Sequence, residues 1–361
     1  CLAGALVYGH TLYAPFYLDD GFAIAENPLV KDLALALKGV FHRRGLSILS
    51  FALNYRIGGF NLVGLHVVNI AIHLAASCIV LLLLRRVFRG RVWWQLFGAL
   101  LFVAHPLQTQ GVTYLVQRMT SLSALLFLLA LYLFVRARER LDAVGSLRDR
   151  RHLTCYVGAI LCGGAAILAK ENALVLPLAL LLFARCFLFA PGARWRPMLA
   201  YTAPFLVLPL AAVVAYLVVP VAMGTKLNTM GYSGLLRSME GNSPLHYLVT
   251  QFSVRWIYLR LLFLPYGQAL DHGYPIAREL LTLKSVAGCA GLAALSALAW
   301  ALRRRQPAIA CGIAWFFLTL AVESSVIPLD PLFEHRLYLP MLAFCLLVPA
   351  SLDLLPRRPW R

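Results

Sequence analysis

Long apolar runs alternate with short, arginine-rich loops along most of this 361-residue chain. A helix that spans a bilayer needs about 20 predominantly apolar residues, and many of the runs are close to that length. The pattern predicts an all-α polytopic membrane protein, a bundle of about ten or eleven transmembrane helices. The expected spans are 1–16 (partial), 61–84, 92–104, 119–135, 153–169, 172–190, 198–223, 284–302, 308–322 and 337–355.

The composition supports this prediction. Hydrophobic residues make up 61% of the chain and charged residues 13%, with a mean hydropathy of +0.76, whereas a soluble domain carries about 25% charged residues. Residue 1 is Cys and the first apolar run is short, so we expect a truncated first span. We expect the whole chain, 1–361, to form a single transmembrane domain.

The net charge of +18 would suit a nucleic-acid-binding protein, but its distribution argues against that function. Arginines concentrate in short loops between apolar runs, as the positive-inside rule describes for cytoplasmic loops. The predicted cytoplasmic segments are 85–91, 136–152, 191–197, 303–307 and 356–361. The predicted external segments are 17–60, 105–118, 170–171, 224–283 and 323–336.

The two longest external loops are expected to carry amphipathic helices on the membrane surface. In 244–265, Arg255 and Arg260 interrupt the apolar run, which indicates a helix in the interface, where arginines extend toward the headgroups. In 33–57, apolar residues recur at helical spacing and predict one or two short helices.

Most of the acidic residues fall on the predicted external side. No acid lies at the centre of a predicted span, where ion-coupled transporters usually carry ionisable groups. The distribution therefore favours an enzyme that works at the membrane surface. The external acids are Asp19, Asp20, Glu26, Asp32, Glu171, Glu240, Asp271, Glu279, Glu323, Asp330 and Glu334.

Asp19 and Asp20 stand side by side where the first apolar run ends. A charged side chain inside the bilayer costs about 2.5–3.5 kcal/mol, so this pair belongs just outside it. One interpretation is a solvated Asp-Asp-Gly turn, and the other is a pair that holds a general base. Adjacent residues in an extended loop point in opposite directions, so we expect one to act and its neighbour to hold the loop. Gly21 permits a close approach, which favours Asp20 as the base.

Three cations on the external side are candidates for binding a phosphate. Lys170, next to Glu171, lies in a tight apolar hairpin of a chain that has few lysines. Arg118 and Arg336 begin spans at the end where the positive-inside rule does not place arginine, and their planar donors suit a phosphate. The alternatives are a helix-capping Lys-Glu pair and arginines that extend to lipid headgroups.

The histidines on the external side differ in their surroundings. His105 precedes a proline at a helix end, which is typical of an interfacial histidine without a catalytic role. His335 lies between Glu334 and Arg336, in a charged cluster that continues to Tyr338, and such a cluster indicates a site.

Neither histidines nor cysteines form a convincing metal site. His66 and His73 lie two turns apart on one face of a predicted span, without an acid or cysteine at ligand spacing. We expect them to be packed polar groups. The eight cysteines lie mostly in apolar runs without a CxxC pair, and we expect small buried side chains instead of a disulfide framework or zinc ligands.

A carboxylate base, cations for a phosphate and access from the bilayer together predict one reaction class. The donor would be a sugar on a polyprenyl phosphate, bound near Arg118, Lys170 or Arg336 with its tail between helices. The cations would stabilise charge that develops on the leaving phosphate, while Asp19 or Asp20 accepts the proton of the acceptor hydroxyl. A single displacement inverts the anomeric carbon and needs no covalent intermediate.

No cofactor is expected for such a monophosphate donor. The alternative is a divalent ion, Mg or Mn, that Asp20 shares with another external acid.

The order of these motifs resembles the GT-C membrane glycosyltransferases, and among them bacterial relatives of the tetratricopeptide-repeat-containing O-mannosyltransferases. The matching residues, spread over nearly the whole chain, are Asp19, Asp20, Asn27 and Pro28; His105 and Pro106; Arg118; Lys170 and Glu171; and Glu334 to Pro340. Family members often carry an acid shortly after His-Pro, where this chain has Gln108 and Gln110. That departure leaves the role of a carboxylate at this point of the chain open.

The resemblance implies a GT-C-like bundle, a lipid-phosphate-linked sugar donor, an inverting reaction and a catalytic carboxylate in the first external loop. It also implies an active site that faces the periplasm or a lumen. Residues expected to contact the donor phosphate or the substrate are His105, Arg118, Lys170, Glu171, Glu334, His335, Arg336 and Tyr338.

The leading hypothesis is an inverting glycosyltransferase of the bacterial inner membrane that modifies a protein or a cell-envelope glycan on the periplasmic face. Its partners would be the lipid-linked donor, the acceptor and membrane lipid, without nucleic acid. One alternative is a ligase or polymerase that moves an oligosaccharide from a polyprenyl diphosphate. Another is a glycolipid transporter, which predicts a polar path through the bilayer and an inverted repeat, and the sequence shows neither.

Overall fold

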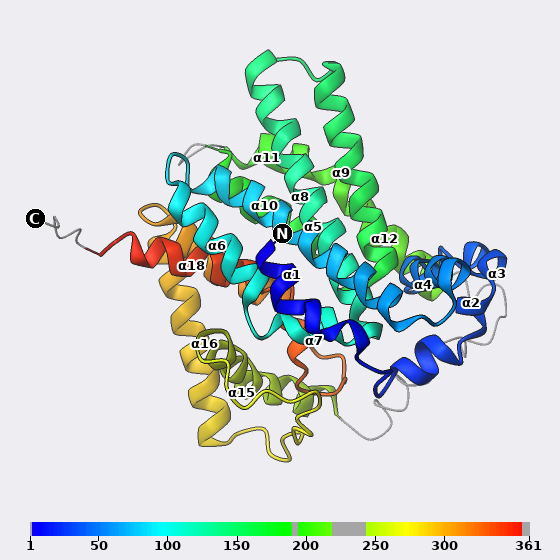
Figure 1. Ribbon diagram of the computed structural model, residues 1–361. Helices are drawn as coiled ribbons and strands as arrows, with labels where there is room; N and C mark the ends of the chain where they lie inside the picture. The colour runs from blue at the N-terminus through cyan, green and yellow to red at the C-terminus, as the bar shows by residue number, and fades with distance from the viewer. Residues whose placement is uncertain (1, 190–193, 219–242, 356–361) are drawn as a thin grey trace, which may run out of the picture.

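The computed structural model describes residues 2–189, 194–218 and 243–355, and these residues form helices and connecting loops without a strand (Figure 1). Within them, five segments are long and apolar enough to cross a membrane. They are α5 (Leu62–Val87), α8 (Arg118–Val144), α9 (Arg150–Ala169), the interrupted segment Trp195–Tyr216, and α16 (Leu283–Leu302). The described residues are thus all-helical, and their long apolar helices indicate an integral membrane protein.

Shorter helices lie at the other predicted spans. They are α1 (Leu2–Tyr8) with η1 (Gly9–Tyr13), α6 (Val92–Ala104), α10 (Leu176–Phe187), α17 (Pro307–Thr319) and α18 (Met341–Leu352). Length and composition therefore support five of the ten expected spans, and the larger count stays a prediction. Residues 190–193, 219–242 and 356–361, which include parts of the predicted loops and the C-terminal tail, lie outside the described residues.

Polar residues set the starts of the long helices. The side chain of Asn61 accepts a hydrogen bond from the backbone N–H of Gly64 (3.1 Å) at the start of α5, and Asp149 caps α9 through His152 (3.0 Å). These side chains satisfy backbone donors that have no partner within the helix. The sequence expectation of a break in the apolar run at each of these points agrees with the observed helix starts.

The core is centred on α8, which packs against α5 and α9. Phe127 and Phe134 of α8 are fully buried, and Phe127 meets the edge of Trp315 from α17. The indole N–H of Trp315 donates to the carbonyl of Leu339 (3.1 Å), which ties α17 to the start of α18. Helices distant in sequence are thereby held in one bundle.

The hairpin of α8 and α9 extends beyond the spans expected at 119–135 and 153–169, and it projects at the top of Figure 1. The basic loop predicted at 136–152 is mostly helical because its charges pair. Arg140 pairs with Asp149 (2.9 Å), and Gly145 ends α8 with a positive φ of 71°. The helices predicted from the sequence are too short here, because paired charges can continue a helix beyond its apolar residues.

Short helices occupy the stretch predicted at 33–57, as expected: α3 (Leu33–Lys38) and α4 (Gly45–Gly58), preceded by α2 (Pro28–Lys31). The stretch predicted at 244–265 is one continuous helix, α15 (Pro244–Phe263), which does not qualify as a span. It packs against α16, where the indole of Trp256 donates to the carbonyl of Gly288 (3.0 Å). Its position on the membrane surface stays a prediction.

Candidate active site

The segment 105–120, which joins α6 to the first turn of α8, connects most of the predicted site residues. It contains α7 (Gln108–Thr113) and η3 (Leu115–Gln117). His105 bonds through Nε2 to the carbonyl of Leu262 (3.0 Å), and Gln110 accepts the backbone N–H of His335 (3.0 Å). This segment brings the last external loop next to the first, because its other end contacts the Asp-Asp turn.

Asp20 is buried, with 1% of its surface exposed. Its Oδ1 accepts the backbone N–H of Val116 (2.7 Å) and its Oδ2 that of Tyr17 (3.0 Å). Leu18, which lies between Tyr17 and Asp20 in the chain, adopts a φ of 42°, a value that is rare for leucine. Asp20 therefore stabilises a strained turn and joins it to η3.

Asp19 is exposed, and its backbone N–H donates to the hydroxyl of Tyr114 (2.9 Å). The two neighbouring carboxylates thus lie in different environments, as the sequence predicts for adjacent residues. Asp20 is held by backbone donors, whereas Asp19 remains accessible to an acceptor. The sequence favours Asp20 as the base, and the accessibility of Asp19 leads us to propose Asp19 for that role below.

Burial raises the pKa of Asp20 to about 6, although the N–H groups of Val116 and Tyr17 favour its charged form. The native protein therefore binds this proton more tightly than the unfolded chain between about pH 4 and 6. The stabilising contribution of protonation is present near pH 4 and is lost as the pH rises toward 6. We expect the stability of wild type relative to Asp20→Asn to fall by up to about 3 kcal/mol over this range.

The measurement is the unfolding temperature of both proteins in detergent at several pH values between 4 and 7. Asp19→Asn serves as the matched control, because it replaces the exposed neighbour. A difference between wild type and Asp20→Asn that does not change with pH would contradict the raised pKa of Asp20.

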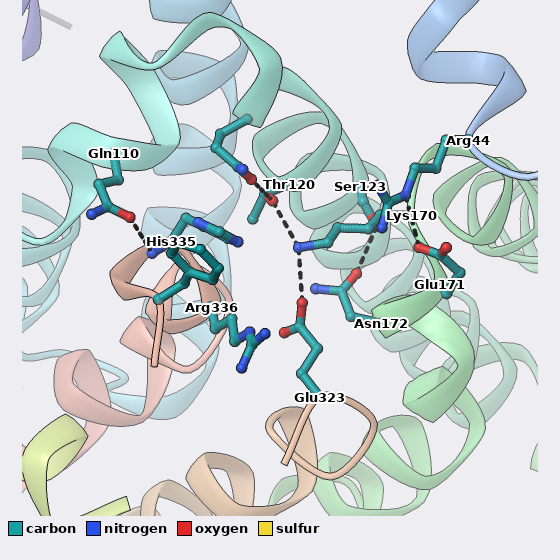
Figure 2. Close-up of polar contacts among 12 residues, drawn as sticks. Arg44, Gln110, Thr120, Ser123, Lys170, Glu171, Asn172, Glu323, His335 and Arg336 are labelled. Carbon is teal, nitrogen blue, oxygen red and sulfur yellow. Dashed lines mark hydrogen bonds and ion pairs between the residues drawn. The ribbon is translucent and has the colours of Figure 1, made fainter. Parts of the chain in front are cut away.

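Lys170 is buried at the end of α9, with 5% of its surface exposed. Its Nζ lies 2.9 Å from Oε1 of Glu323 and 3.0 Å from the hydroxyl of Thr120 (Figure 2). Burial lowers the pKa of Lys170, and the charge of Glu323 partly offsets that effect. The side chain of Lys170 caps no helix, so its ammonium group does not have the capping role of the alternative interpretation.

Glu171 begins η4 (Glu171–Val175) and turns away from Lys170 toward the loop before α4. It pairs with Arg43 and, at 3.2 Å, with Nε of Arg44. Burial raises the pKa of Glu171, but the charges of Arg44 and Arg43 outweigh this and hold it at about 2. Glu171 is therefore ionised and fixes two arginines beside Lys170.

A cavity of about 220 Å³ opens beside these groups. Its polar and charged lining residues are Arg43, Arg44, Lys170, Glu171, Asn172 and Glu323. Its apolar lining includes Leu174, Val213, Val322, Ile327 and Leu329. A ligand with a charged head and a hydrocarbon tail matches this mixed lining.

His335 and Arg336, in η7 (Glu334–Leu337), lie on the other side of the Lys170–Glu323 pair (Figure 2). Burial, reinforced by the charges of Lys170 and Arg336, lowers the pKa of His335 well below its usual range, so its ring is neutral. Among the described residues, Nδ1 of His335 and Oε2 of Glu323 have no hydrogen-bond partner. Buried polar atoms usually have partners, so both atoms are available to a ligand.

Arg118 is completely buried and its donors all meet protein groups. Nε donates to Asn69 (2.6 Å) and Nη2 to the carbonyl of Leu65 (2.9 Å), while the guanidinium lies 4.1 Å above the ring of Phe51. These contacts join α8 to α5 and α4. They leave Arg118 directed neither to lipid headgroups nor into the cavity beside Lys170.

Glu334, Tyr338 and His105 also serve packing contacts. Glu334 is buried and accepts hydrogen bonds from Ala269 (2.9 Å) and Gln268 (2.9 Å), which holds the loop after α15. The hydroxyl of Tyr338 lies 2.7 Å from Nδ1 of His73. These residues surround the cavity-lining groups and position the segments that carry them.

The two histidines of α5 are buried polar groups, as predicted. His66 bonds to the carbonyl of Ala14 (2.9 Å), and His73 to Tyr338 and the carbonyl of Val103 (3.1 Å). In the part of the chain that the structure describes, no group of three or more His, Cys, Asp or Glu side chains is placed to hold a metal ion. Cys155, Cys162, Cys186, Cys289, Cys311 and Cys345 are free thiols, and Cys1 lies outside the described residues.

Several cavity residues were not among the predicted site residues: Arg43, Arg44, Asn172 and Glu323. A signal for the arginines was present, because both lie in a predicted external loop, where the positive-inside rule does not place them. Glu323 was counted among the external acids, but no local pattern distinguished it from the others.

The chain is similar to animal protein O-mannosyl-transferases. It is 35% identical over 210 residues to Tmtc1 of Drosophila melanogaster, in a match that covers 54% of this chain and 23% of that protein. It is 34% identical over 194 residues to TMTC1 of Homo sapiens, covering 47% and 21%, and 29% identical over 187 residues to human TMTC2, covering 47% and 21%.

The matched part thus spans less than a quarter of the length of these curated relatives. No family model and no solved structure matches the chain. About half of this chain is therefore related in sequence to protein O-mannosyl-transferases.

Proposed function

We propose that this chain is a membrane glycosyltransferase that transfers a sugar from a polyprenyl phosphate to a hydroxyl group of a protein, with a cell-envelope glycan as the alternative acceptor. The proposal includes a GT-C-like bundle of about ten or eleven transmembrane helices and an active site on the periplasmic face of a bacterial inner membrane. The observation that carries it is the cavity whose lining combines three cationic side chains with apolar ones. The relationship to protein O-mannosyl-transferases supports the reaction and the protein acceptor.

The charge of the cavity favours a monophosphate donor. Arg43, Arg44 and Lys170 exceed the carboxylates of Glu171 and Glu323 by one charge. A sugar joined to a polyprenyl monophosphate carries one negative charge, whereas a diphosphate carries two. The oligosaccharide ligase, which uses a diphosphate, would leave one negative charge without a partner in this cavity, and burying an unpaired charge is costly.

The reaction then follows from the positions of the two groups. The acceptor oxygen forms a bond to the anomeric carbon while the bond from that carbon to the phosphate oxygen breaks, which inverts the carbon. Asp19 takes the proton of the acceptor hydroxyl. Lys170 and the two arginines stabilise the second negative charge that develops on the departing phosphate.

The Asp-Asp turn and the cationic cavity are connected through one short segment. Asp19 contacts Tyr114, Asp20 contacts Val116, and Lys170 contacts Thr120. Residues 116 and 120 are about 6 Å apart along a helical axis. Val116, which holds the Asp-Asp turn, and Thr120, which contacts Lys170, therefore lie about one helical turn apart, which suits a substrate that lies across this segment.

The test is a transfer assay in lipid nanodiscs with a radiolabelled mannosyl polyprenyl phosphate and a Ser/Thr-rich peptide as acceptor. We expect the monophosphate donor to be consumed with inversion of the anomeric carbon, and Arg44→Gln to weaken donor binding at least about tenfold, as for loss of a charged hydrogen bond. Lys38→Gln, an exposed external cation, is the control.

Two results would contradict the proposal. Consumption of a polyprenyl diphosphate donor alone would favour the ligase. Donor binding by Arg44→Gln that equals that of Lys38→Gln would exclude the cavity as the phosphate site. The same assay with EDTA tests the absence of a divalent metal requirement.

A further inference from the structure

A second, larger cavity lies away from the candidate active site. It has a volume of about 850 Å³ and is formed by α15, α16, α17 and α18. Its walls are almost entirely apolar, and they include Phe263, Phe316, Phe344 and Leu347. None of its lining residues belongs to the cavity beside Lys170.

One end of this cavity is cationic. A hollow of about 500 Å³ shares Trp256 and Arg260 with it and is also lined by Ser253 and Lys284. No acidic residue lines either space, in contrast to the active-site cavity, where carboxylates pair with the cations. Two positive charges therefore lie beside an apolar groove without a carboxylate in its lining.

Both cations lie against tyrosine rings. The guanidinium of Arg260 is 4.6 Å from the ring centre of Tyr266 and donates to its carbonyl (3.1 Å), while Lys284 donates to the hydroxyl of Tyr274 (3.0 Å). Tyrosines concentrate at the depth of lipid headgroups. Arg260 lies within the predicted external loop 224–283 and Lys284 directly follows it, at positions where the positive-inside rule does not place cations.

The wall between the two spaces is fixed in position. The indole of Trp256 donates to the carbonyl of Gly288 and its ring packs on Gly291, where a side chain would collide with it. At Gly288 an added Cβ would lie 3.1 Å from the carbonyl oxygen of Phe252. These two glycines let α15 approach α16 closely and hold the tryptophan between groove and hollow.

We propose that the groove and the hollow form a binding site for an anionic glycerophospholipid of the surrounding bilayer. Its phosphate lies at Arg260 and Lys284, and one acyl chain occupies the apolar groove between α15 and α18. A phosphate ester matches guanidinium and ammonium donors, and the almost entirely apolar lining of the groove suits a hydrocarbon chain. This site is independent of the proposed sugar transfer.

The lipid would also explain the position of α16. Only Ser285, Gly288, Leu292 and Ala299 of this helix are buried by protein. An acyl chain that contacts α15, α16, α17 and α18 together adds packing where protein contacts are few. Bound anionic lipid should therefore stabilise this part of the bundle.

The test uses nanodiscs of phosphatidylcholine that contain brominated phosphatidylglycerol or, in a parallel sample, brominated phosphatidylcholine. Bromine quenches the fluorescence of a nearby tryptophan, and subtraction of Trp256→Phe isolates the signal of Trp256. Each cation near an anionic headgroup contributes roughly a fivefold preference, so we expect an overall preference of about 30-fold for phosphatidylglycerol.

The double variant Arg260→Ala, Lys284→Ala should lose this preference, and Arg260→Lys, Lys284→Arg should keep it. Arg303→Ala, Arg304→Ala, at the opposite end of α16, is the matched control. Equal quenching by both brominated lipids in wild type would show only surrounding lipid and overturn the proposal. Native mass spectrometry that finds a polyprenyl phosphate in place of a diacyl lipid, lost in the double alanine variant, would overturn it as well.

Discussion

Asp19→Asn is expected to reduce sugar transfer at least about 10²-fold, the contribution of a positioned general base. Asparagine matches aspartate in size but cannot accept the proton of the acceptor hydroxyl. Asp19 is exposed, so the substitution should change the free energy of unfolding by no more than about 0.5 kcal/mol. Donor binding should also stay unchanged, because the base contacts the acceptor and not the phosphate.

The matched comparison is Asp20→Asn. An amide can accept only one of the two backbone N–H groups that Asp20 now accepts from Val116 and Tyr17, and an unsatisfied buried donor costs about 1–3 kcal/mol. This variant should therefore lose stability as well as activity. If Asp19→Asn retains full transfer while folded Asp20→Asn has none, Asp20 is the base and our assignment fails.

Removal of Lys170 should have the largest effect on stability. Lys170→Met leaves Glu323 as a buried charge without its partner, which costs about 3–5 kcal/mol. The double variant Lys170→Met, Glu323→Gln removes both charges and should recover most of that loss. Transfer should stay abolished in both variants, because neither retains the ammonium group that meets the donor phosphate.

Stability follows from thermal unfolding in nanodiscs, and phosphate recognition from binding of labelled donor. A single variant as stable as wild type would exclude a buried ion pair between Lys170 and Glu323. A stable double variant with normal donor binding would show that Lys170 has only a structural role.

The positions of the helices were predictable because apolar length decides where a helix can cross a bilayer. Helices α5, α9 and α16 begin and end within a few residues of the expected spans. The extension of α8 to Val144 was missed, since its last turns are stabilised by ion pairs outside the apolar layer. A hydropathy pattern predicts the apolar part of a helix, but it does not predict charged turns that extend the helix beyond that part.

Individual site residues were predictable only where they conflicted with their surroundings. Lys170 and Arg118 attract attention because each is a cation that topology does not require. Their environments nevertheless differ: Lys170 lines a cavity, whereas the donors of Arg118 meet Asn69 and backbone carbonyls. The sequence shows that an arginine is present. Which oxygen atoms accept hydrogen bonds from its guanidinium depends on how α4, α5 and α8 pack.

The sequence by itself predicted a helical membrane protein with most of its acids and several unusual cations in the loops assigned to the external side. Only the tertiary structure decided which of them meet. Glu323 reaches Lys170 across 152 intervening positions in the chain, and Asp20 turns inward to Val116 while Asp19 remains exposed. The reason is physical: burial and pairing are properties of packed helices, and adjacent residues of one loop can face opposite environments.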